Sequence, residues 1–243
     1  MTGHDEVNLL SCLIAKKAGN CRTIARVRNP EYVDEIGFIK EELGLSVAIN
    51  PELATARDIE RLIQVPSALD VDTFAKGRAY MVRFEIPKGS PWHELRVMDA
   101  AVKYGNHFLV CILERGDDVV IPSGNTVMME GDTISMISPT EDMNRLFNVI
   151  GIPARPIRNV MIAGGGTIAY YLAQRLLKTK VNTTIIESNL QRCNELSEKL
   201  DRATIIHGDA ADSKLLLEEG LEQMDAFVAL TNFDEENIML SLY

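Results

Sequence analysis

The sequence contains few cysteines, no excess of positive charge and no long apolar run, and each absence excludes a class of protein. The four cysteines form no Cys-x-x-Cys pair and the four histidines are scattered, which favours a reduced cytosolic compartment and no metal centre. No apolar stretch approaches the roughly 20 residues of a membrane span, and no signal peptide is visible at the N-terminus. The net charge of −10 argues against nucleic acid or an anionic membrane surface as the main partner.

The chain does contain a repeat that joins its two ends. Residues 2–8 read Thr-Gly-His-Asp-Glu-Val-Asn, and residues 231–237 read Thr-Asn-Phe-Asp-Glu-Glu-Asn. Four positions are identical at a constant offset of 229 residues, and an apolar run follows each copy. Such internal similarity indicates a repeated fold. We therefore expect the chain to open in the middle of one domain and to close in the middle of a second, similar one.

The carboxy-terminal third predicts half of a nucleotide-binding fold. Residues 159–163 form a short apolar run, typical of a buried strand, and a Gly-x-Gly-x-x-Ala fingerprint begins at Gly164. Gly164 permits a tight turn, Gly166 lets the backbone approach a pyrophosphate, and the alanine allows the next helix to pack closely on the strand. The first N–H groups of that helix, at Thr167 and Ile168, are expected to face the phosphates.

An acidic residue stands where this fold recognises a ribose. Glu187 closes the next predicted strand, residues 182–187, and follows Gly166 by 21 residues. At this spacing a carboxylate accepts hydrogen bonds from the ribose hydroxyls and repels a 2′-phosphate. The alternative interpretation is a solvated residue at the end of a strand.

Two further strands are predicted to end at the same edge of the sheet. Residues 203–207 lead into Gly208, Asp209 and Ala210, and residues 225–230 lead into Thr231 and Asn232. Ligands of such sheets bind at the carboxyl ends of the strands, so Asp209, Ala210, Thr231 and Asn232 join the candidate site. Asp234 and Glu235 begin the following helix, and we expect them to cap it and to complement its dipole.

The amino-terminal quarter supplies elements that normally follow these. It predicts helices over residues 5–18 and 51–64, a helix from Pro30, and strands over residues 23–27 and 46–49. Joined to the carboxy-terminal third, this segment would complete one doubly wound α/β domain. Strand 23–27 would then pair beside strand 225–230 and bring Arg26 opposite Gly164 and Gly166. Phosphate binding is one interpretation of Arg26, and a surface ion pair is the other.

The middle of the chain predicts a small α+β module without a catalytic set. We expect a helix over residues 91–104, with Leu95, Met98 and Val102 turned inward, and Trp92 in the core. The segment 151–156 has the composition of a linker, and Val65-Pro66 marks a weaker boundary. The predicted domains are therefore residues 1–65, 66–150 and 151–243.

Several of these strings resemble the RCK (regulator of K⁺ conductance) family. They are Ala-Arg-Val-Arg-Asn-Pro-Glu-Tyr at residues 25–32, Ile-Asn-Pro-Glu at residues 49–52, Gly-Asp-Ala at residues 208–210, and the stretch 231–237. The middle module is similar to the small domain of this family, including Ile-Pro-x-Gly from residue 121 and Gly131-Asp132. The resemblance implies two tandem Rossmann-like domains, each followed by a small domain. This chain would span the end of the first to the start of the second.

The resemblance also implies a function. Family members bind NAD(H) or the adenine nucleotides ATP and ADP, and they gate a membrane potassium channel. This chain would then be a cytoplasmic regulatory subunit rather than an enzyme, held at the inner face of the cell membrane by a TrkH-like channel subunit and assembled as a homo-oligomer. Gly164, Gly166, Glu187, Asp209 and Arg26 would contact the nucleotide.

Two other functions remain open from the residues alone. An NAD-dependent oxidoreductase needs a proton donor or acceptor near the nicotinamide, yet Tyr170 and Tyr171 are followed four positions later by Gln174 and Arg175 rather than by lysine. An assembly module without a ligand is the other alternative, because the first copy lacks a Gly-rich turn and an acidic ribose residue. If the two halves complement each other, the module between them favours a domain-swapped dimer.

Overall fold

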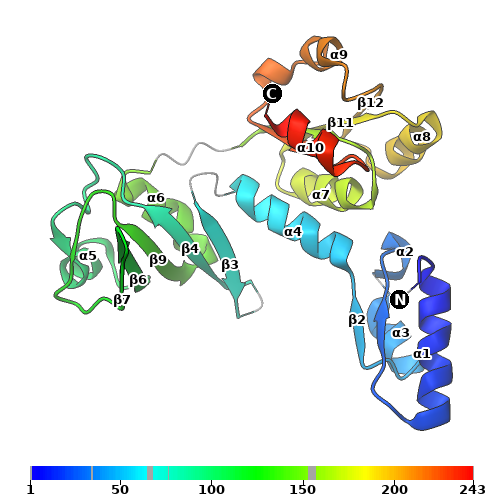
Figure 1. Ribbon diagram of the computed structural model, residues 1–243, viewed down its shortest axis with the longest axis horizontal. Helices are drawn as coiled ribbons and strands as arrows, with labels where there is room; N and C mark the ends of the chain where they lie inside the picture. The colour runs from blue at the N-terminus through cyan, green and yellow to red at the C-terminus, as the bar shows by residue number, and fades with distance from the viewer. Residues whose placement is uncertain (1, 34, 65–67, 76, 153–156, 243) are drawn as a thin grey trace. The chain divides into compact units, whose positions relative to one another are not determined.

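The computed structural model describes residues 2–33, 35–64, 68–75, 77–152 and 157–242 (Figure 1). The chain divides into two compact units. We call Met1–Glu60 together with Ile157–Tyr243 the split unit, and Arg61–Pro156 the small unit. The expected boundary at Val65-Pro66 and most of the expected linker 151–156 lie outside the described residues.

A parallel sheet of four strands forms the carboxy-terminal half of the split unit. The strands are β10 (Asn159–Ala163), β11 (Asn182–Glu187), β12 (Thr204–His207) and β13 (Ala226–Ala229). They are hydrogen-bonded in the order β12-β11-β10-β13, all parallel. The chain therefore runs outward through β10, β11 and β12 and then returns to the far side of β10. Such a reversal is the switch point at which doubly wound sheets bind ligands.

The helices of this half pack one apolar face on the sheet. They are α7 (Thr167–Lys178), α8 (Leu190–Lys199), α9 (Ser213–Glu218) and α10 (Asp234–Ser241). In α7 the buried residues include Ala169, Leu172 and Leu176, which recur at helical spacing, and residues 160–163 of β10 are buried as well. The Rossmann-like α/β fold predicted from the sequence is thereby confirmed.

The amino-terminal half of the split unit has a sheet of its own. Its elements are α1 (Asp5–Gly19), β1 (Ile24–Arg26), α2 (Pro30–Val33), α3 (Ile36–Glu42), β2 (Val47–Ile49) and α4 (Pro51–Gln64). Strands β1 and β2 pair in parallel, with Ala25 opposite Ala48. Ala25, Val27 and Leu45 form a small buried core against Leu9 of α1.

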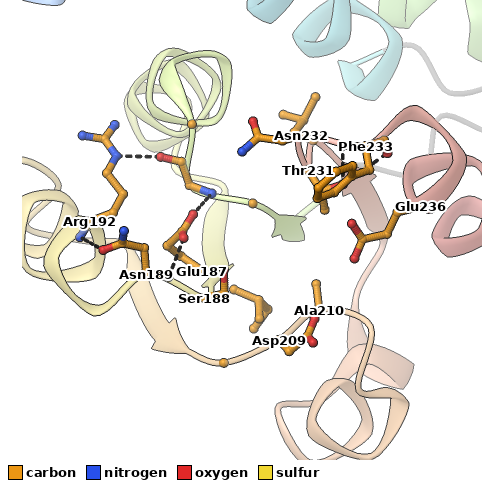
Figure 2. A pocket seen from close by; sticks show the side chains of 16 residues that line it. Glu187, Ser188, Asn189, Arg192, Asp209, Ala210, Thr231, Asn232, Phe233 and Glu236 are labelled. Carbon is orange, nitrogen blue, oxygen red and sulfur yellow. Dashed lines mark hydrogen bonds between the residues drawn. The ribbon is translucent and has the colours of Figure 1, made fainter.

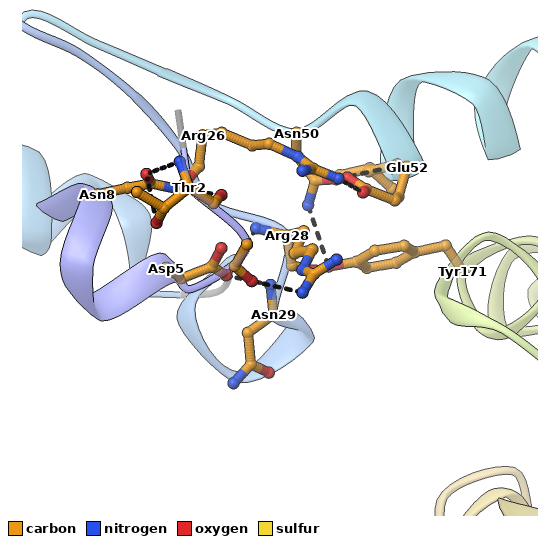
Figure 3. A network of polar contacts seen from close by, with 11 residues as sticks. Thr2, Asp5, Asn8, Arg26, Arg28, Asn29, Asn50, Glu52 and Tyr171 are labelled. Atoms are coloured by element: carbon orange, nitrogen blue, oxygen red, sulfur yellow. Dashed lines mark hydrogen bonds and ion pairs between the residues drawn. The ribbon is translucent and has the colours of Figure 1, made fainter.

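Strand β1 does not pair with β13, so the predicted pairing is wrong within one chain. Among the described strands, β1 is bonded to β2 and β13 to β10. The physical reason is that α1 already packs on β1 just as α10 packs on β13. If β1 paired beside β13, both helices would need the same position next to the two strands, and that position cannot hold two helices. The halves instead meet at Tyr171 of α7, whose hydroxyl donates to the Arg28 carbonyl over 2.9 Å and accepts from the Asn50 amide over 3.1 Å (Figure 3).

The small unit is built on an antiparallel sheet of five strands. In sheet order they are β3 (Asp70–Phe74), β4 (Ala79–Glu85), β9 (Thr133–Pro139), β6 (Leu109–Arg115) and β7 (Asp118–Val120). The ladder β5 (Leu95–Arg96) with β8 (Val127–Met128) and the helices α5 (Val97–Tyr104) and α6 (Met143–Ile150) complete it. Trp92 lies in the core, as predicted, and its ring contacts those of Tyr104 and Phe108.

The helix predicted over residues 91–104 is shorter than expected. It begins at Val97, because the Val97 and Met98 N–H groups donate to the carbonyls of Thr126 and Gly124. Backbone pairing with the neighbouring segment thus takes donors that a longer helix would have used at its start. Ala100 is the buried residue of the helix that forms, and Met98 and Val102 are exposed rather than turned inward.

Candidate functional site

The three consecutive glycines after β10 have different roles. Gly164 has φ +98°, and a Cβ there would lie 2.5 Å from the Leu230 carbonyl oxygen. A Cβ on Gly165 would lie 2.7 Å from Leu196 Cδ1 and 2.8 Å from Glu187 Oε2. Gly166 has open space around the position of a Cβ and is exposed. The first two glycines therefore maintain the turn, and the third leaves the backbone accessible at the start of α7.

A cavity of about 380 Å³ lies at the carboxyl ends of the four parallel strands. It is lined by Gly164, Gly165, Gly166, Ile186, Glu187, Ser188, Asn189, Arg192, Gly208, Asp209, Ala210, Leu230, Thr231, Asn232, Phe233 and Glu236. In Figure 2 Glu187, Ser188, Asn189 and Arg192 form one wall, while Thr231, Asn232, Phe233 and Glu236 form the other. Four strand ends separated in sequence thus converge on one hollow.

The middle glycine of the turn is held by two side chains. The Gly165 N–H donates to Glu187 Oε2 over 2.7 Å, and Arg192 Nε donates to the Gly165 carbonyl over 2.8 Å. The other Glu187 oxygen accepts from the Asn189 N–H over 2.7 Å. A carboxylate oxygen has two acceptor positions, so Glu187 can hold the turn and still accept from a ligand hydroxyl.

The remaining predicted residues of this half lie around the turn. Asp209 is exposed and accepts from the Ala211 N–H over 2.9 Å, while Ala210 is buried. Thr167 and Ile168 are the first two residues of α7 and do not line the cavity. The Tyr170 N–H bonds the Gly166 carbonyl. The N–H groups of Thr167 and Ile168 come before it in the helix and belong to the positive end of the helix.

A knot of hydrogen bonds shapes the second wall. The Thr231 N–H donates to Asn237 Oδ1 over 2.8 Å, and Asn237 Nδ2 donates to the Thr231 carbonyl over 3.1 Å. The Thr231 hydroxyl contacts the Phe233 carbonyl and N–H over 3.4 Å each. The side chain of Asn237 on α10 thus fixes the end of β13 in place.

The first copy of the repeat forms the same knot (Figure 3). The Thr2 N–H donates to Asn8 Oδ1 over 2.7 Å, and Asn8 Nδ2 donates to the Thr2 carbonyl over 3.3 Å. The Thr2 hydroxyl contacts the His4 carbonyl over 3.1 Å and the His4 N–H over 3.3 Å. These four bonds correspond at the offset of 229, so the sequence repeat is also a structural repeat.

Two expectations about side chains near the site require correction. Arg26 does not line this cavity; it forms a partly buried ion pair with Glu52 of α4, whereas the alternative considered for it was an ion pair at the surface. Asp234 does not cap α10: the cap residue is Phe233, and it makes no side-chain cap bond. Asp234 and Glu235 do lie in the first turn of α10, where negative charge complements the helix dipole.

The sequence predictions omitted several residues of the cavity wall, among them Ser188, Asn189, Arg192, Phe233 and Glu236. One signal was available: Asn189 follows the acidic strand end and caps α8 by accepting from the Arg192 N–H over 3.1 Å. A cap at that point turns the first residues of α8 toward the strand end. Nothing in the sequence marked Phe233 and Glu236 as cavity residues, apart from their closeness to Thr231.

The surroundings of the cavity contain a buried thiol that favours its neutral form. Burial and the Glu187 charge raise the pKa of the Cys193 thiol, which contacts the Glu187 carbonyl over 3.3 Å.

Within the part of the chain that the structure describes, no group of three or more His, Cys, Asp and Glu could hold a metal ion. Across those same residues, no helix has both the length and the apolarity to cross a membrane.

The Gly-rich turn, the acidic strand end and the switch point define a Rossmann-like domain of the kind that binds nucleotides. The family model of the TrkA-N domain matches residues 160–243, and that of the TrkA-C domain matches residues 81–151. The chain therefore contains regions that match the TrkA-N and TrkA-C domains.

Known proteins similar to this chain carry the names of a potassium uptake system. The chain is 39% identical over 242 residues to the Trk system potassium uptake protein TrkA homolog of Archaeoglobus fulgidus, covering all of this chain and 55% of that protein. It is 36% identical over 246 residues to the TrkA protein of Halomonas elongata, covering all of this chain and 53% of that protein. The chain thus spans about half the length of these relatives, and their names are those of transport proteins, not enzymes.

Solved structures show the same fold. The GsuK RCK domain matches with a TM-score of 0.62 at 18% identity, over 98% of this chain and 50% of that chain. The GsuK channel bound to NAD matches with a TM-score of 0.62 at 17% identity, over 98% of this chain and 41% of that chain. At such low identity the likeness concerns the fold alone.

Proposed function

We propose that the cavity binds an adenine nucleotide, NAD(H) or ATP and ADP, and that its occupancy regulates a potassium uptake system. The observation that carries this proposal is the position of Gly166. Its open face lies at the N-terminus of α7 and on the wall of a cavity that Glu187 also lines. Backbone N–H groups and the helix dipole would hold the phosphates there, while Glu187 would accept from the ribose hydroxyls.

Glu187 favours NAD(H) over NADP(H). A 2′-phosphate would bring negative charge beside its carboxylate, at a cost of about 1 kcal/mol or more. Arg192 lies in the same wall, but its guanidinium donates to the Gly165 carbonyl over 2.8 Å and to Glu195 over 2.7 Å. An arginine engaged in this way offers a 2′-phosphate little compensation. Equal affinity for NADH and NADPH in calorimetry would remove Glu187 from this role.

Regulation would act on a membrane partner. The relatives are named as Trk system potassium uptake proteins, and one structural neighbour is a channel bound to NAD. We infer a cytoplasmic subunit that sits at the inner face of the membrane through a TrkH-like channel subunit. Nucleotide would bind one arrangement of the domains more tightly and so shift the population that acts on the channel.

Self-association is a further part of the proposal. In a swapped dimer, β1 of one copy would pair with the open edge of β13 in another. Because α1 packs on β1 and α10 on β13, that pairing requires one of the two helices to leave its strand. We therefore propose a homo-oligomer in which each copy retains its own packing. Sedimentation equilibrium of the purified chain tests this, and a monomer at all concentrations would contradict it.

Calorimetry on a glycine variant tests the binding proposal. Gly166→Val places a branched side chain in open space at the start of α7, so nucleotide affinity should fall at least tenfold. The fold should persist with a loss of about 1 kcal/mol, the usual effect of a poor cap residue. Gly37→Val is the matched control, since Gly37 on α3 is also exposed with open space around it. Unchanged binding by Gly166→Val would make the turn a structural loop, and no binding by the wild type would favour the assembly module.

A further inference from the structure

One aromatic ring stands on the wall of the cavity without a structural role of its own. Phe233 is 67% exposed, although it lines the cavity. Its ring is not part of the core that packs β13 and α10 onto the sheet, to which Phe227 and Leu240 contribute. Among the described residues that line the cavity, it is the aromatic one. Single exposed apolar side chains are common on protein surfaces, so the feature that distinguishes Phe233 is its position on the wall of the cavity.

The backbone that carries this ring is fixed. Phe233 precedes α10 in an extended conformation, with φ −120° and ψ 117°. Its N–H and carbonyl both contact the Thr231 hydroxyl, and Asn237 holds Thr231 in turn. The corresponding residue of the first copy, His4, is held by the same bonds. The exposed ring is therefore presented by an ordered loop, and little backbone entropy would be lost when a ligand covers it.

We propose that the Phe233 ring stacks on the planar heteroaromatic base of a nucleotide bound in this cavity, an inference that rests on the proposed function. Glu187 and Gly166 account for the ribose and phosphates, but neither recognises a base. Phe233 stands on the opposite wall from Glu187 (Figure 2). Offset stacking on an aromatic face tolerates any base and excludes water from both rings. Adenine and nicotinamide share this chemistry, and separate ligands distinguish them.

The test compares three variants by calorimetry with NADH, AMP and nicotinamide mononucleotide. Phe233→Ala should weaken NADH binding by about fivefold to a hundredfold, the range expected for loss of one stacked base. Phe233→Trp keeps a stacking surface and should bind at least as well as the wild type. Phe38→Ala is the control, because Phe38 is a similarly exposed phenylalanine, 64% against 67%, on α3 outside the cavity. It should change affinity less than twofold.

A second measurement reports contact directly. The chain has one tryptophan, Trp92, which is buried in the small unit. A tryptophan at position 233 adds a fluorophore at the cavity, and NADH binding should quench its emission much more than that of the wild type. Whichever mononucleotide loses affinity in Phe233→Ala identifies the stacked base.

The outcomes separate this inference from the function on which it rests. If the wild type binds NADH and Phe233→Ala binds all three ligands equally well, the stacking role is overturned and the nucleotide site stands. If the wild type binds none of the three ligands and neither ATP nor ADP, both proposals fail together. Thermal unfolding of Phe233→Ala should match the wild type, because the ring is mostly exposed; a large drop would assign the ring to structure instead.

Discussion

The two copies of the repeat make the same knot of hydrogen bonds in different surroundings. Asp5 in the first copy is only 5% exposed and accepts from the Arg28 N–H over 2.8 Å and the Asn29 N–H over 2.7 Å. Its counterpart Asp234 is exposed at the start of α10. In the first copy the N–H groups that reach the carboxylate come from Arg28 and Asn29, which follow the end of β1. The difference shows that the short repeated sequence specifies the shared hydrogen bonds. The residues packed beside each copy decide how much its aspartate contributes to stability.

The largest expected difference between the copies concerns this aspartate. Asp5→Ala leaves two backbone N–H groups without their acceptor beside a buried site, so we expect a loss of about 2–4 kcal/mol in the free energy of unfolding. Asp234→Ala should cost less than about 0.5 kcal/mol, as most exposed substitutions do. Urea unfolding of both variants measures the contrast. Equal losses would mean that the burial of Asp5 does not matter for stability.

The asparagines of the two knots should differ in a second way. Asn8 is buried and also donates to the Arg26 carbonyl over 3.1 Å, so Asn8→Ala should cost about 1–3 kcal/mol. Asn237→Ala should cost about 1 kcal/mol but should also weaken nucleotide binding, because Asn237 positions the Thr231 wall of the cavity. Calorimetry and urea unfolding on both variants separate the effects. Stronger loss of binding in Asn8→Ala would contradict this assignment.

Tyr171 and Asp5 both hydrogen-bond the backbone of Arg28, in the loop that follows β1. The Tyr171 hydroxyl donates to the Arg28 carbonyl, while Asp5 accepts from the Arg28 N–H. Tyr171→Phe should cost about 1 kcal/mol. Burial raises the Tyr171 pKa to about 12. Because the unfolded chain releases this proton first, at a pKa near 10, wild-type stability should decline as the pH rises above about 10, and Tyr171→Phe should lack that part of the decline. Parallel alkaline curves for the two proteins would contradict the assignment.

The smallest effect concerns a second aspartate that accepts from two consecutive N–H groups. Asp225 accepts from the Arg158 N–H over 2.8 Å and the Asn159 N–H over 2.9 Å, and these bonds lower its pKa. Its contribution to stability should therefore be present above the ordinary carboxyl pKa of about 3.9 and be lost as the pH falls through the lower folded value. Asp225→Asn should flatten the acid limb of urea unfolding relative to the wild type. An unchanged acid limb in Asp225→Asn would assign the acid sensitivity to other carboxylates.

The sequence by itself determined the elements with a strong local period. Strands over residues 159–163 and 182–187 have the predicted bounds, as does the helix Pro51–Gln64, because apolar runs and an initial proline set them locally. The spacing from the Gly-rich turn to Glu187 likewise predicted that the two lie near each other. They line the same cavity because β10 and β11 are parallel and end side by side, with Ala163 opposite Ile186.

Tertiary structure decided what depends on distant partners. The start of α5 depended on carbonyls of Gly124 and Thr126, and the role of Arg26 depended on Glu52 of α4. The exposure of Phe233 was equally hidden, because an aromatic residue in a sequence looks the same whether it packs in a core or faces a cavity. Hydrogen-bond donors, charges and apolar rings are fixed by composition, but their partners are chosen by which strand or helix occupies the neighbouring space.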